Sequence, residues 1–366
     1  MAHTEGLVRA RHSGFAAQRS HDCGVARRDG RAIPDRLAVV FREQGVRWSW
    51  KEFANEVDAF AAGLQELGLR KGDRVGIWSP NRVEWLVTQF ATARLGLVLV
   101  NINPAYRLAE LEYALGVSGC RAVVSAQEMK TSKYLEMLQT VRPQLPRLEW
   151  IIRMGEGRTP DMLNYADLLA KGRGGTIREE PLDCHDPINI QFTSGTTGSP
   201  KGATLTHHNV VNNARFIAQA LNFSEADRLC IPVPLYHCFG MVLAVLACVS
   251  TGATMVFPGE MFDPAAVLAA VSEERCTALH GVPTMFIAEL AHPDFKTFDS
   301  ILAADGDHGR LAMPHRNHAA GGLRDEHERG DHRLRHDGDV AGILPELDGR
   351  PAGTTCNNGR AYSATS

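Results

Sequence analysis

Short apolar segments alternate with segments of helical periodicity between about residues 35 and 299, and this alternation is the strongest constraint on the fold. Behind a Ser49 cap, apolar side chains recur at three- and four-residue spacing at Phe53, Val57, Phe60, Leu64 and Leu67. Further strands are predicted at 75–78, 97–102, 122–125, 189–192, 254–257 and 277–280, and further helices at 84–95, 108–115, 209–221 and 263–274. This order predicts βαβ units with a mostly parallel sheet, that is, an α/β fold.

Charge and cysteine usage exclude several classes of protein. The net charge is -3, and no clustered basic face is evident, so neither nucleic acid nor an acidic membrane is an expected partner. The 8 Cys show no Cys-x-x-Cys pair, which argues against a disulfide framework or a structural zinc site. The longest apolar stretch, 241–249, is too short to cross a bilayer, and no secretory signal is visible. A cytoplasmic location is expected, without an integral membrane segment, and no protein partner is evident.

The sharpest local signal is the stretch IQFTSGTTGSPKG at residues 190–202. Its glycines permit positive φ and a close approach of the backbone to a ligand, its hydroxyls can donate hydrogen bonds, and Lys201 adds a positive charge. These are the parts of a phosphate-binding loop, to which the helix predicted after it would add its positive end if the fold directs it there. A Walker A loop is excluded, because Lys201 follows Pro200 and precedes Gly202.

This stretch resembles the signature loop of the adenylate-forming superfamily. Two earlier stretches, KGDRVGIWSPN at 71–81 and NINPAY at 101–106, and a later one, PVPLYHCFG at 232–240, are similar in order and rough spacing to stretches of bacterial medium- and long-chain fatty-acyl-CoA synthetases. The chain is thus identified as a member of the AMP-forming acyl-CoA synthetases. The resemblance covers residues 34 to 299 and implies the βαβ-layered large N-terminal domain of these enzymes.

The resemblance implies a two-step ligase reaction. A fatty-acid carboxylate attacks the α-phosphorus of ATP to give acyl-AMP and pyrophosphate, and the thiol of CoA then displaces AMP. Mg²⁺ would bridge the phosphate oxygens, and Lys201 would offset their charge as a catalytic residue. The expected ATP contacts are Thr193, Ser194, Gly195, Thr196, Thr197, Gly198 and Lys201.

His237 lies where this family places an aromatic or histidine residue beside the acyl and carboxylate site, which implies a catalytic or substrate-binding role. Phe239 and Gly240 would shape the same wall, and Gly281 lies in a segment similar to one near the acyl pocket. Cys238 is discounted as a nucleophile paired with His237, because sequence neighbours on an extended segment point to opposite faces. The pair His207 and His208 lacks a third metal ligand at a useful spacing and is interpreted as the surface start of a helix.

Residues 300–366 differ in character from the preceding sequence. They contain no Phe or Trp and six of the 15 His. One choice of codons for residues 332–342, read one base later, gives IAYGMTETSP, which resembles a further signature of the same family. We therefore expect a frame change near residues 299–301, which the nucleotide sequence would show. The expected organisation is an unassigned leader at 1–33, which can share this fault, a partial AMP-binding domain at 34–299, and a disordered, out-of-frame tail at 300–366 without the family's small C-terminal domain.

Two kinds of function stay open at this point. The first is a fatty-acyl-CoA ligase by descent, with the chain as written expected to be inactive because adenine, ribose and CoA contacts are missing. The second is a non-catalytic nucleotide-binding fragment or pseudoenzyme. Among ligases, an aryl-CoA ligase and a luciferase-like enzyme are the alternatives, whereas a peptide-synthetase adenylation domain is disfavoured because no carrier-protein segment is visible.

Overall fold

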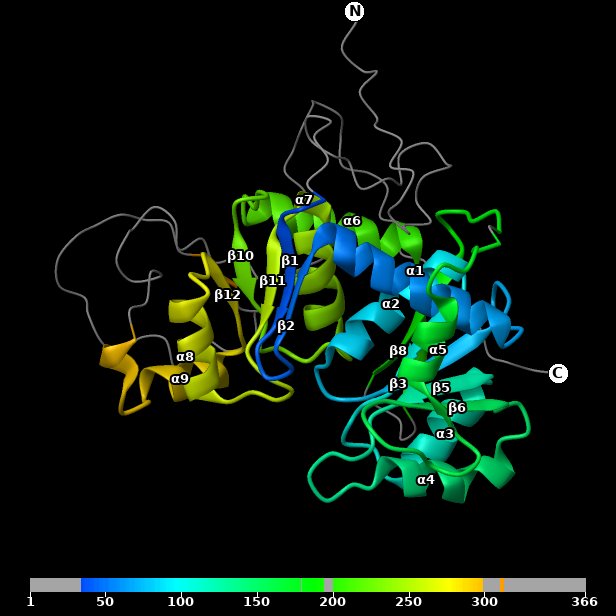
Figure 1. The fold of residues 1–366 in the computed structure, drawn as a ribbon. Coiled ribbons are helices and arrows are strands. Elements are labelled where there is room, and N and C mark those ends of the chain that lie inside the picture. Colours follow the sequence, from blue (N-terminus) through cyan, green and yellow to red (C-terminus); the bar gives the residue numbers. More distant parts are fainter. Residues whose placement is uncertain (1–33, 179, 194–199, 299–309, 313–366) are drawn as a thin grey trace, which may run out of the picture.

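The computed structural model describes residues 34–178, 180–193, 200–298 and 310–312, and these form two β-sheets with helices packed between and around them (Figure 1). One sheet has the strand order β13 (Arg310–Ala312), β12 (Ala278–His280), β10 (Arg228–Cys230), β11 (Thr254–Phe257), β1 (Leu37–Phe41) and β2 (Val46–Ser49). The other has the order β7 (Leu163–Asn164), β6 (Trp150–Arg153), β5 (Ala122–Ser125), β3 (Arg74–Trp78), β4 (Val98–Asn101), β8 (Pro187–Thr193) and β9 (Lys201–Thr206).

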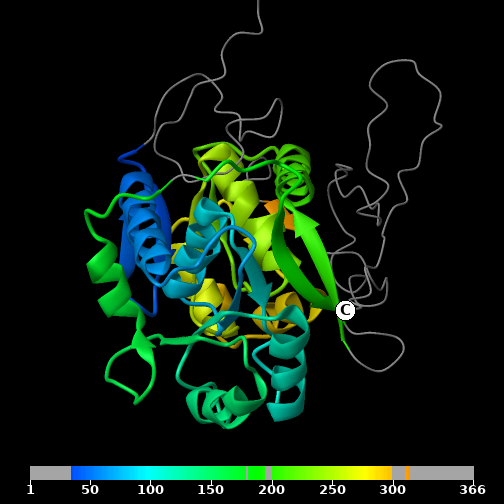
Figure 2. The same cartoon turned by 90° about the vertical axis from the view of Figure 1, so that its right-hand side faces the viewer.

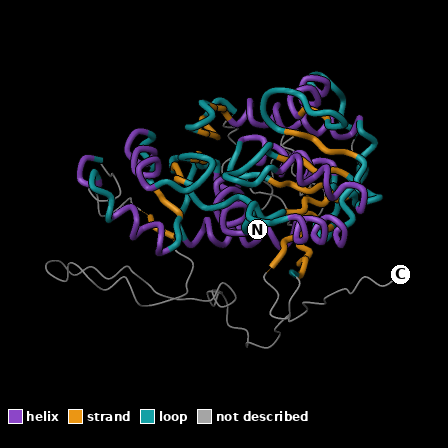
Figure 3. Tube along the Cα trace, turned by 90° about the horizontal axis from the view of Figure 1, so that it is seen from below, coloured by secondary structure: helices purple, strands orange, loops and turns teal. Residues whose placement is uncertain are grey.

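Both sheets are parallel except at one edge. In the first sheet only β1 and β2 pair antiparallel, and in the second only β8 and β9 do so, counting the described strands. The helices are α1 (Trp50–Glu66), α2 (Val83–Leu95), α3 (Leu108–Ser118), α4 (Tyr134–Val141), α5 (Tyr165–Gly172), α6 (His207–Ala220), α7 (Ala247–Thr251), α8 (Pro264–Glu273) and α9 (Pro283–Leu290), with a π-helix, η4, at Phe239–Leu246. Figure 3 shows strands in the middle of the molecule with helices around them, and other strands at its edge. The predicted α/β class is confirmed, with two sheets in place of one.

Capping residues define the helix starts that the sequence predicts most clearly. The Ser49 hydroxyl accepts a hydrogen bond from the Glu52 backbone N–H, and the Glu52 carboxylate accepts one from the Ser49 N–H, which is a complete capping box at the start of α1. Asp263 caps α8 by accepting from the N–H of Ala266 at 2.8 Å. Both predicted caps are therefore confirmed.

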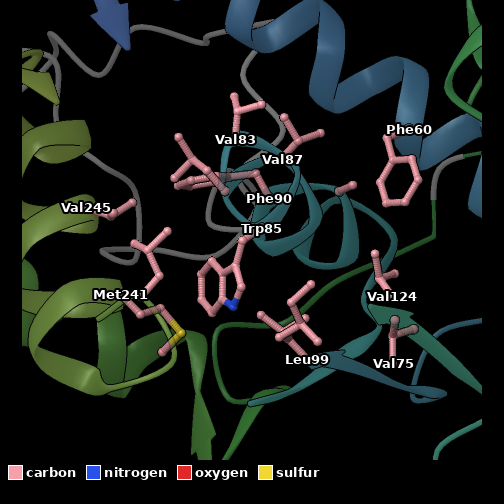
Figure 4. Close-up of a cluster of buried hydrophobic side chains, with 14 of the residues drawn as sticks. Phe60, Val75, Val83, Trp85, Val87, Phe90, Leu99, Val124, Met241 and Val245 are labelled. Atoms are coloured by element: carbon pink, nitrogen blue, oxygen red, sulfur yellow. The ribbon is translucent and has the colours of Figure 1, made fainter. Parts of the chain in front are cut away.

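Helix α2 lies in the interior between the two sheets. Most of its residues are buried, including Trp85, which is 0% exposed. Figure 4 shows Trp85 and Phe90 of α2 among side chains from β4 and η4, such as Leu99 and Met241. Because this helix is buried on nearly all sides, its apolar residues contact both sheets, and one continuous hydrophobic cluster joins them. No helix among the described residues has the length and apolar character needed to cross a membrane.

A close contact between α1 and α5 depends on glycine. A Cβ atom at Gly172 would lie 1.8 Å from the carbonyl oxygen of Ala59, whereas a Cβ at Gly116 in α3 would be 3.6 Å from its nearest neighbour. We expect Gly172→Ala to lower the free energy of unfolding by about 1–3 kcal/mol through overpacking. We expect the matched control, Gly116→Ala, to raise it by about 0.5–1 kcal/mol, because alanine favours a helix interior. Urea unfolding of both variants measures the difference, and equal effects would contradict this packing.

Candidate active site

The predicted phosphate loop connects two antiparallel strands at an edge of the sheet. Thr193 ends β8, Lys201 begins β9, and the two residues are register partners, with the Thr193 hydroxyl donating to the Lys201 carbonyl oxygen at 3.4 Å. Both residues are exposed, and Figure 2 shows the green strands of this hairpin at the side of the molecule. The remaining predicted ATP contacts lie outside the described residues: Ser194, Gly195, Thr196, Thr197 and Gly198.

The helix that follows the loop does not point its N-terminus at it. Strand β9 intervenes, and α6 begins only after Thr206, which caps it by accepting from the N–H of Asn209. Thr206 pairs with Pro187, at the opposite end of the hairpin from the loop. Six residues of strand correspond to about 20 Å, so the dipole of α6 is too distant to stabilise phosphate at the loop. The fold therefore does not support the hypothesis that the N-terminus of this helix contributes to phosphate binding at the loop.

The turn that contains His237 is tied to the same end of β8. The backbone carbonyl oxygen of Tyr236 accepts hydrogen bonds from the Gln191 amide at 2.6 Å and from the Asn101 amide at 3.0 Å. Gln191 lies two residues before Thr193, and Asn101 ends the neighbouring strand β4. The fold therefore brings the His237 turn and the two ends of the phosphate loop to the carboxyl ends of β4 and β8.

A row of buried amides holds this arrangement, and the sequence analysis did not identify it. Asn189 donates to the side-chain oxygen of Asn101 at 2.9 Å, and Asn101 donates to that of Gln191 at 3.2 Å. All three side chains are buried. The available signal was the alternation of Asn189 and Gln191 with apolar residues in a predicted strand, because a buried amide needs a partner on the next strand.

Breaking the amide row should destabilise the protein. Asn101→Leu removes one hydrogen-bond partner each from the buried Asn189 and Gln191 side chains and from the Tyr236 carbonyl, so we expect a loss of about 1–3 kcal/mol in the free energy of unfolding. Asn213, an exposed residue whose amide donates only to the Asn209 carbonyl within α6, provides the control. Asn213→Leu should change stability by less than about 0.5 kcal/mol. Urea unfolding compares the two, and a neutral Asn101→Leu would contradict the proposed role of the row.

His237 is held in one tautomer by its own turn. Its Nδ1 accepts a hydrogen bond from the backbone N–H of Phe239 at 3.1 Å, so the neutral ring carries its proton on Nε2. The residue is exposed on one side, yet partial burial of the ring lowers its pKa below the usual 6.5. At neutral pH, His237 is thus an uncharged ring that can donate a hydrogen bond from Nε2.

The other predicted substrate residues are packed tightly behind this turn. Phe239 is 7% exposed and stacks on the ring of His280 with 5.2 Å between centroids. A Cβ at Gly240 would lie 2.3 Å from the carbonyl oxygen of Pro234, and one at Gly281 would lie 2.9 Å from the ring of Phe286. Both glycines therefore permit close packing, and their roles toward substrate stay predictions.

His280 is a second buried histidine that the sequence analysis did not single out. It is 0% exposed, lies between the rings of Phe223 and Phe239, and neither ring nitrogen has a hydrogen-bond partner among the described residues. Burial lowers its pKa to about 3. His280 is the last residue of β12 and directly precedes Gly281, so its ring brings the end of β12 into contact with Phe239.

Cys238 does not act as a thiolate. Burial raises the pKa of its thiol, which lies 3.5 Å from the side-chain oxygen of Gln191. A neutral thiol is a weak nucleophile, so the structure agrees with the prediction that Cys238 is not a nucleophile paired with His237. The reason differs, since residues 237 and 238 lie in a turn that leads into a helix rather than in an extended segment.

Comparison with known proteins identifies the family. Residues 26–324 match the family described as AMP-binding enzyme. The chain belongs to this family. As a member of the AMP-binding enzymes, it is similar to the medium-chain acyl-CoA ligase ACSF2 of Danio rerio, with 43% identity over 286 residues that cover 73% of this chain and 47% of the relative. It is also 45% identical to YngI of Bacillus subtilis (strain 168) over 286 residues, covering 73% of this chain and 52% of YngI.

Solved structures of AMP-binding enzymes agree with the fold. The anthranilate CoA ligase AuaEII, in complex with anthranoyl-AMP, superimposes with a TM-score of 0.67 at 27% identity, over 73% of this chain and 50% of that one. The N-terminal domain of FACL13 from Mycobacterium tuberculosis gives a TM-score of 0.64 at 26% identity, over 77% and 66% of the two chains. The predicted relationship to AMP-forming acyl-CoA ligases and the predicted N-terminal domain fold are confirmed.

The chain spans about half the length of the curated relatives it matches, 52% of YngI and 47% of the fish ACSF2. The family match at 26–324 extends past both predicted boundaries, 34 and 299. These boundaries, and the frame change near residue 300, stay predictions. The cytoplasmic location also stays a prediction, and the ACSF2 relative is named as mitochondrial.

Proposed function

We propose that the chain supplies the adenylating part of a fatty-acyl-CoA ligase with a preference for medium-chain acids. The observation that carries this proposal is the convergence of Thr193, Lys201 and the His237 turn at the carboxyl ends of β4 and β8. Ligands of open α/β sheets bind outside these strand ends. The medium-chain preference is supported by the name of the ACSF2 relatives.

The residues at the hairpin fit the phosphates of ATP. Lys201 is exposed and forms no ion pair with any described carboxylate, so its charge is available to an anion. ATP is the substrate, with Mg²⁺ bound to its phosphate oxygens. In the proposed reaction a fatty-acid carboxylate oxygen attacks the α-phosphorus, the bond to pyrophosphate breaks, and Lys201 offsets the charge of the departing phosphates.

His237 orients the acid in this proposal. Its Nε2–H donates a hydrogen bond to the fatty-acid carboxylate, while the Nδ1 contact to Phe239 holds the ring in position. Phe239 lies against His280 and forms the apolar wall beside the acyl chain. In the second step the thiol of CoA attacks the acyl carbon, AMP leaves, and the thiol proton passes to solvent.

The acid specificity can be tested in a chimera in which residues 34–298 replace the matched half of the Danio rerio ACSF2. We expect octanoate to support exchange of labelled pyrophosphate into ATP and benzoate to support little. Benzoate is included because AuaEII, a similar structure, is an anthranilate CoA ligase in complex with anthranoyl-AMP, which is an aryl adenylate. Exchange with benzoate but not octanoate would favour an aryl-CoA ligase, and a folded chimera without exchange would favour the non-catalytic alternative.

The 366-residue polypeptide by itself is expected to form no CoA thioester from ATP, CoA and octanoate or palmitate. The resemblance implies that contacts to adenine, ribose and CoA come from the part of the relatives that this sequence does not match, and thioester formation depends on those contacts. Each lost polar contact costs about 1.5–3 kcal/mol of binding. Thioester formed faster than by a Lys201→Ala control would contradict this expectation.

A further inference from the structure

Three consecutive residues before β8 bring three different metal-binding groups together. A carboxylate oxygen of Asp183, Sγ of Cys184 and a ring nitrogen of His185 all lie within 4.8 Å of one another. The turn is held by its own hydrogen bonds, from the His185 N–H to the Asp183 carboxylate at 2.8 Å and from the Asp183 N–H to the Asp186 carboxylate at 2.7 Å. These hydrogen bonds fix the backbone of the turn that carries the three donors.

The thiol of Cys184 is buried in this cluster without a partner. The residue is 7% exposed, forms no disulfide, and its thiol has no hydrogen bond to any residue that the structure describes. Its sulfur nevertheless lies beside a carboxylate and an imidazole. A buried thiol directed at two other ligand groups is a feature expected of a metal site.

The start of α6 places His208 next to this cluster, although His208 is not among the residues whose donor atoms lie within 4.8 Å of one another. The backbone N–H of His208 donates to the Cys184 carbonyl oxygen at 2.8 Å, which fixes the start of α6 beside the turn. The His208 ring stacks on that of His185, with 5.3 Å between centroids. From the sequence, His207 and His208 lack a third ligand at a useful spacing, whereas in the fold rotation of the exposed His208 side chain would bring its ring to the three donors of residues 183–185.

We propose that Asp183, Cys184, His185 and His208 bind Zn²⁺. Thiolate, imidazole and carboxylate together suit zinc, whereas Mg²⁺ and Ca²⁺ prefer oxygen ligands alone. Zinc bonds of about 2.0–2.3 Å require these donors to move closer, which side-chain rotation of the three exposed residues allows. On binding, Zn²⁺ replaces the thiol proton of Cys184, which leaves to solvent.

The site would be structural, because four protein ligands leave zinc no open position. It connects the turn before β8 to the start of α6, at the end of the hairpin opposite Thr193 and Lys201. It is therefore separate from the magnesium of the ATP substrate and does not depend on the proposed ligase activity. Asp186 is not part of the donor set, because it pairs with Lys71 at 2.6 Å.

Cobalt titration of the chelator-treated 366-residue chain tests the site. Co²⁺ should bind with a thiolate-to-cobalt charge-transfer band, and one equivalent of Zn²⁺ should remove that band. Cys184→Ser should abolish the band, and His208→Gln should weaken Co²⁺ binding by about tenfold or more. Cys238→Ser, which removes a thiol outside the cluster, should leave both unchanged.

Two results of the cobalt titration would overturn the proposal. The first is Co²⁺ binding by the unmutated chain without a thiolate band, which would mean that the metal binds histidines or carboxylates elsewhere. The second is a band that persists in Cys184→Ser, which would assign it to another cysteine. Should Cys184→Ser fail to fold, thermal unfolding of the unmutated chain decides, because Zn²⁺ should raise its midpoint and a chelator should reverse the change. An unchanged midpoint would also overturn the proposal.

Discussion

Lys201→Ala should lower octanoate-dependent ATP–pyrophosphate exchange by about 10²–10³-fold in the ACSF2 chimera, the loss typical for removal of one preorganised charge contact. Lys201 begins β9 opposite Thr193, is exposed, and has no carboxylate partner among the described residues. Its charge therefore lies at the base of the loop and is not neutralised by any described carboxylate. The loss should fall on the rate rather than on folding, because an exposed lysine contributes little to stability.

The control for this prediction is Lys171→Ala, which removes an exposed lysine from α5. We expect that variant to keep the exchange rate of the unmutated chimera. Thr196→Ala, which removes one predicted hydroxyl donor of the loop, should also lower the rate. Unchanged exchange in both Lys201→Ala and Thr196→Ala would remove the loop from the mechanism.

Acidification should destabilise the described fold through two buried histidines, His280 and His207. The interpretation of His207 as a surface residue is wrong, because it is 3% exposed at the start of α6. Burial lowers the pKa of His280 to about 3 and that of His207 to about 4, from an unfolded value of 6.5. Both rings are neutral when folded and take up a proton on unfolding below pH 6.5, so the unfolded state binds more protons there. Stability is therefore complete above pH 6.5 and is lost as the pH falls toward 4. Each histidine contributes a slope of about 1.4 kcal/mol per pH unit within its window.

Urea unfolding of the chain at pH 5 and pH 7 measures this slope. His280→Leu should lower the slope between these pH values by about 1.4 kcal/mol per pH unit, because its proton is no longer taken up on unfolding. Phe239→Leu provides the control, since it removes the stacking partner of His280 but no titrating group. It should lower stability similarly at both pH values. A full slope in His280→Leu would show that other groups cause the acid sensitivity.

Helices and central strands were predictable because their signals are local. The Ser49 and Asp263 caps and the apolar periodicity of α1 appear in the structure as predicted. The separation into two sheets was not predictable in this way. Strand β1 pairs with β11, with Val39 opposite Met255, and no local pattern in either strand specifies a partner so distant in the sequence. A strand of three residues such as β10, which was not predicted, is also too short to give a periodic signal.

For the candidate site, the sequence identified individual residues but not which of them contact one another. Lys201 and His237 were identified from motifs, and the fold places both near the end of β8. The amide row was missed because Asn101 and Gln191 form a unit only across neighbouring strands. The direction of α6 was also not predictable from the sequence. Residues 201–206 form a strand before α6 because they pair with β8, and this pairing is a tertiary feature. Such relations depend on tertiary pairing, which a single sequence does not state.

Identification of the product of ATP cleavage tests the central claim most directly. The chimera that contains residues 34–298 is incubated with ATP, Mg²⁺ and octanoate, without CoA, and its products are resolved by mass spectrometry. The account predicts octanoyl-AMP and an equal amount of pyrophosphate, with neither formed when octanoate is omitted. Release of ADP, or no cleavage by a chimera that unfolds at the same temperature as its active ACSF2 parent, would contradict it.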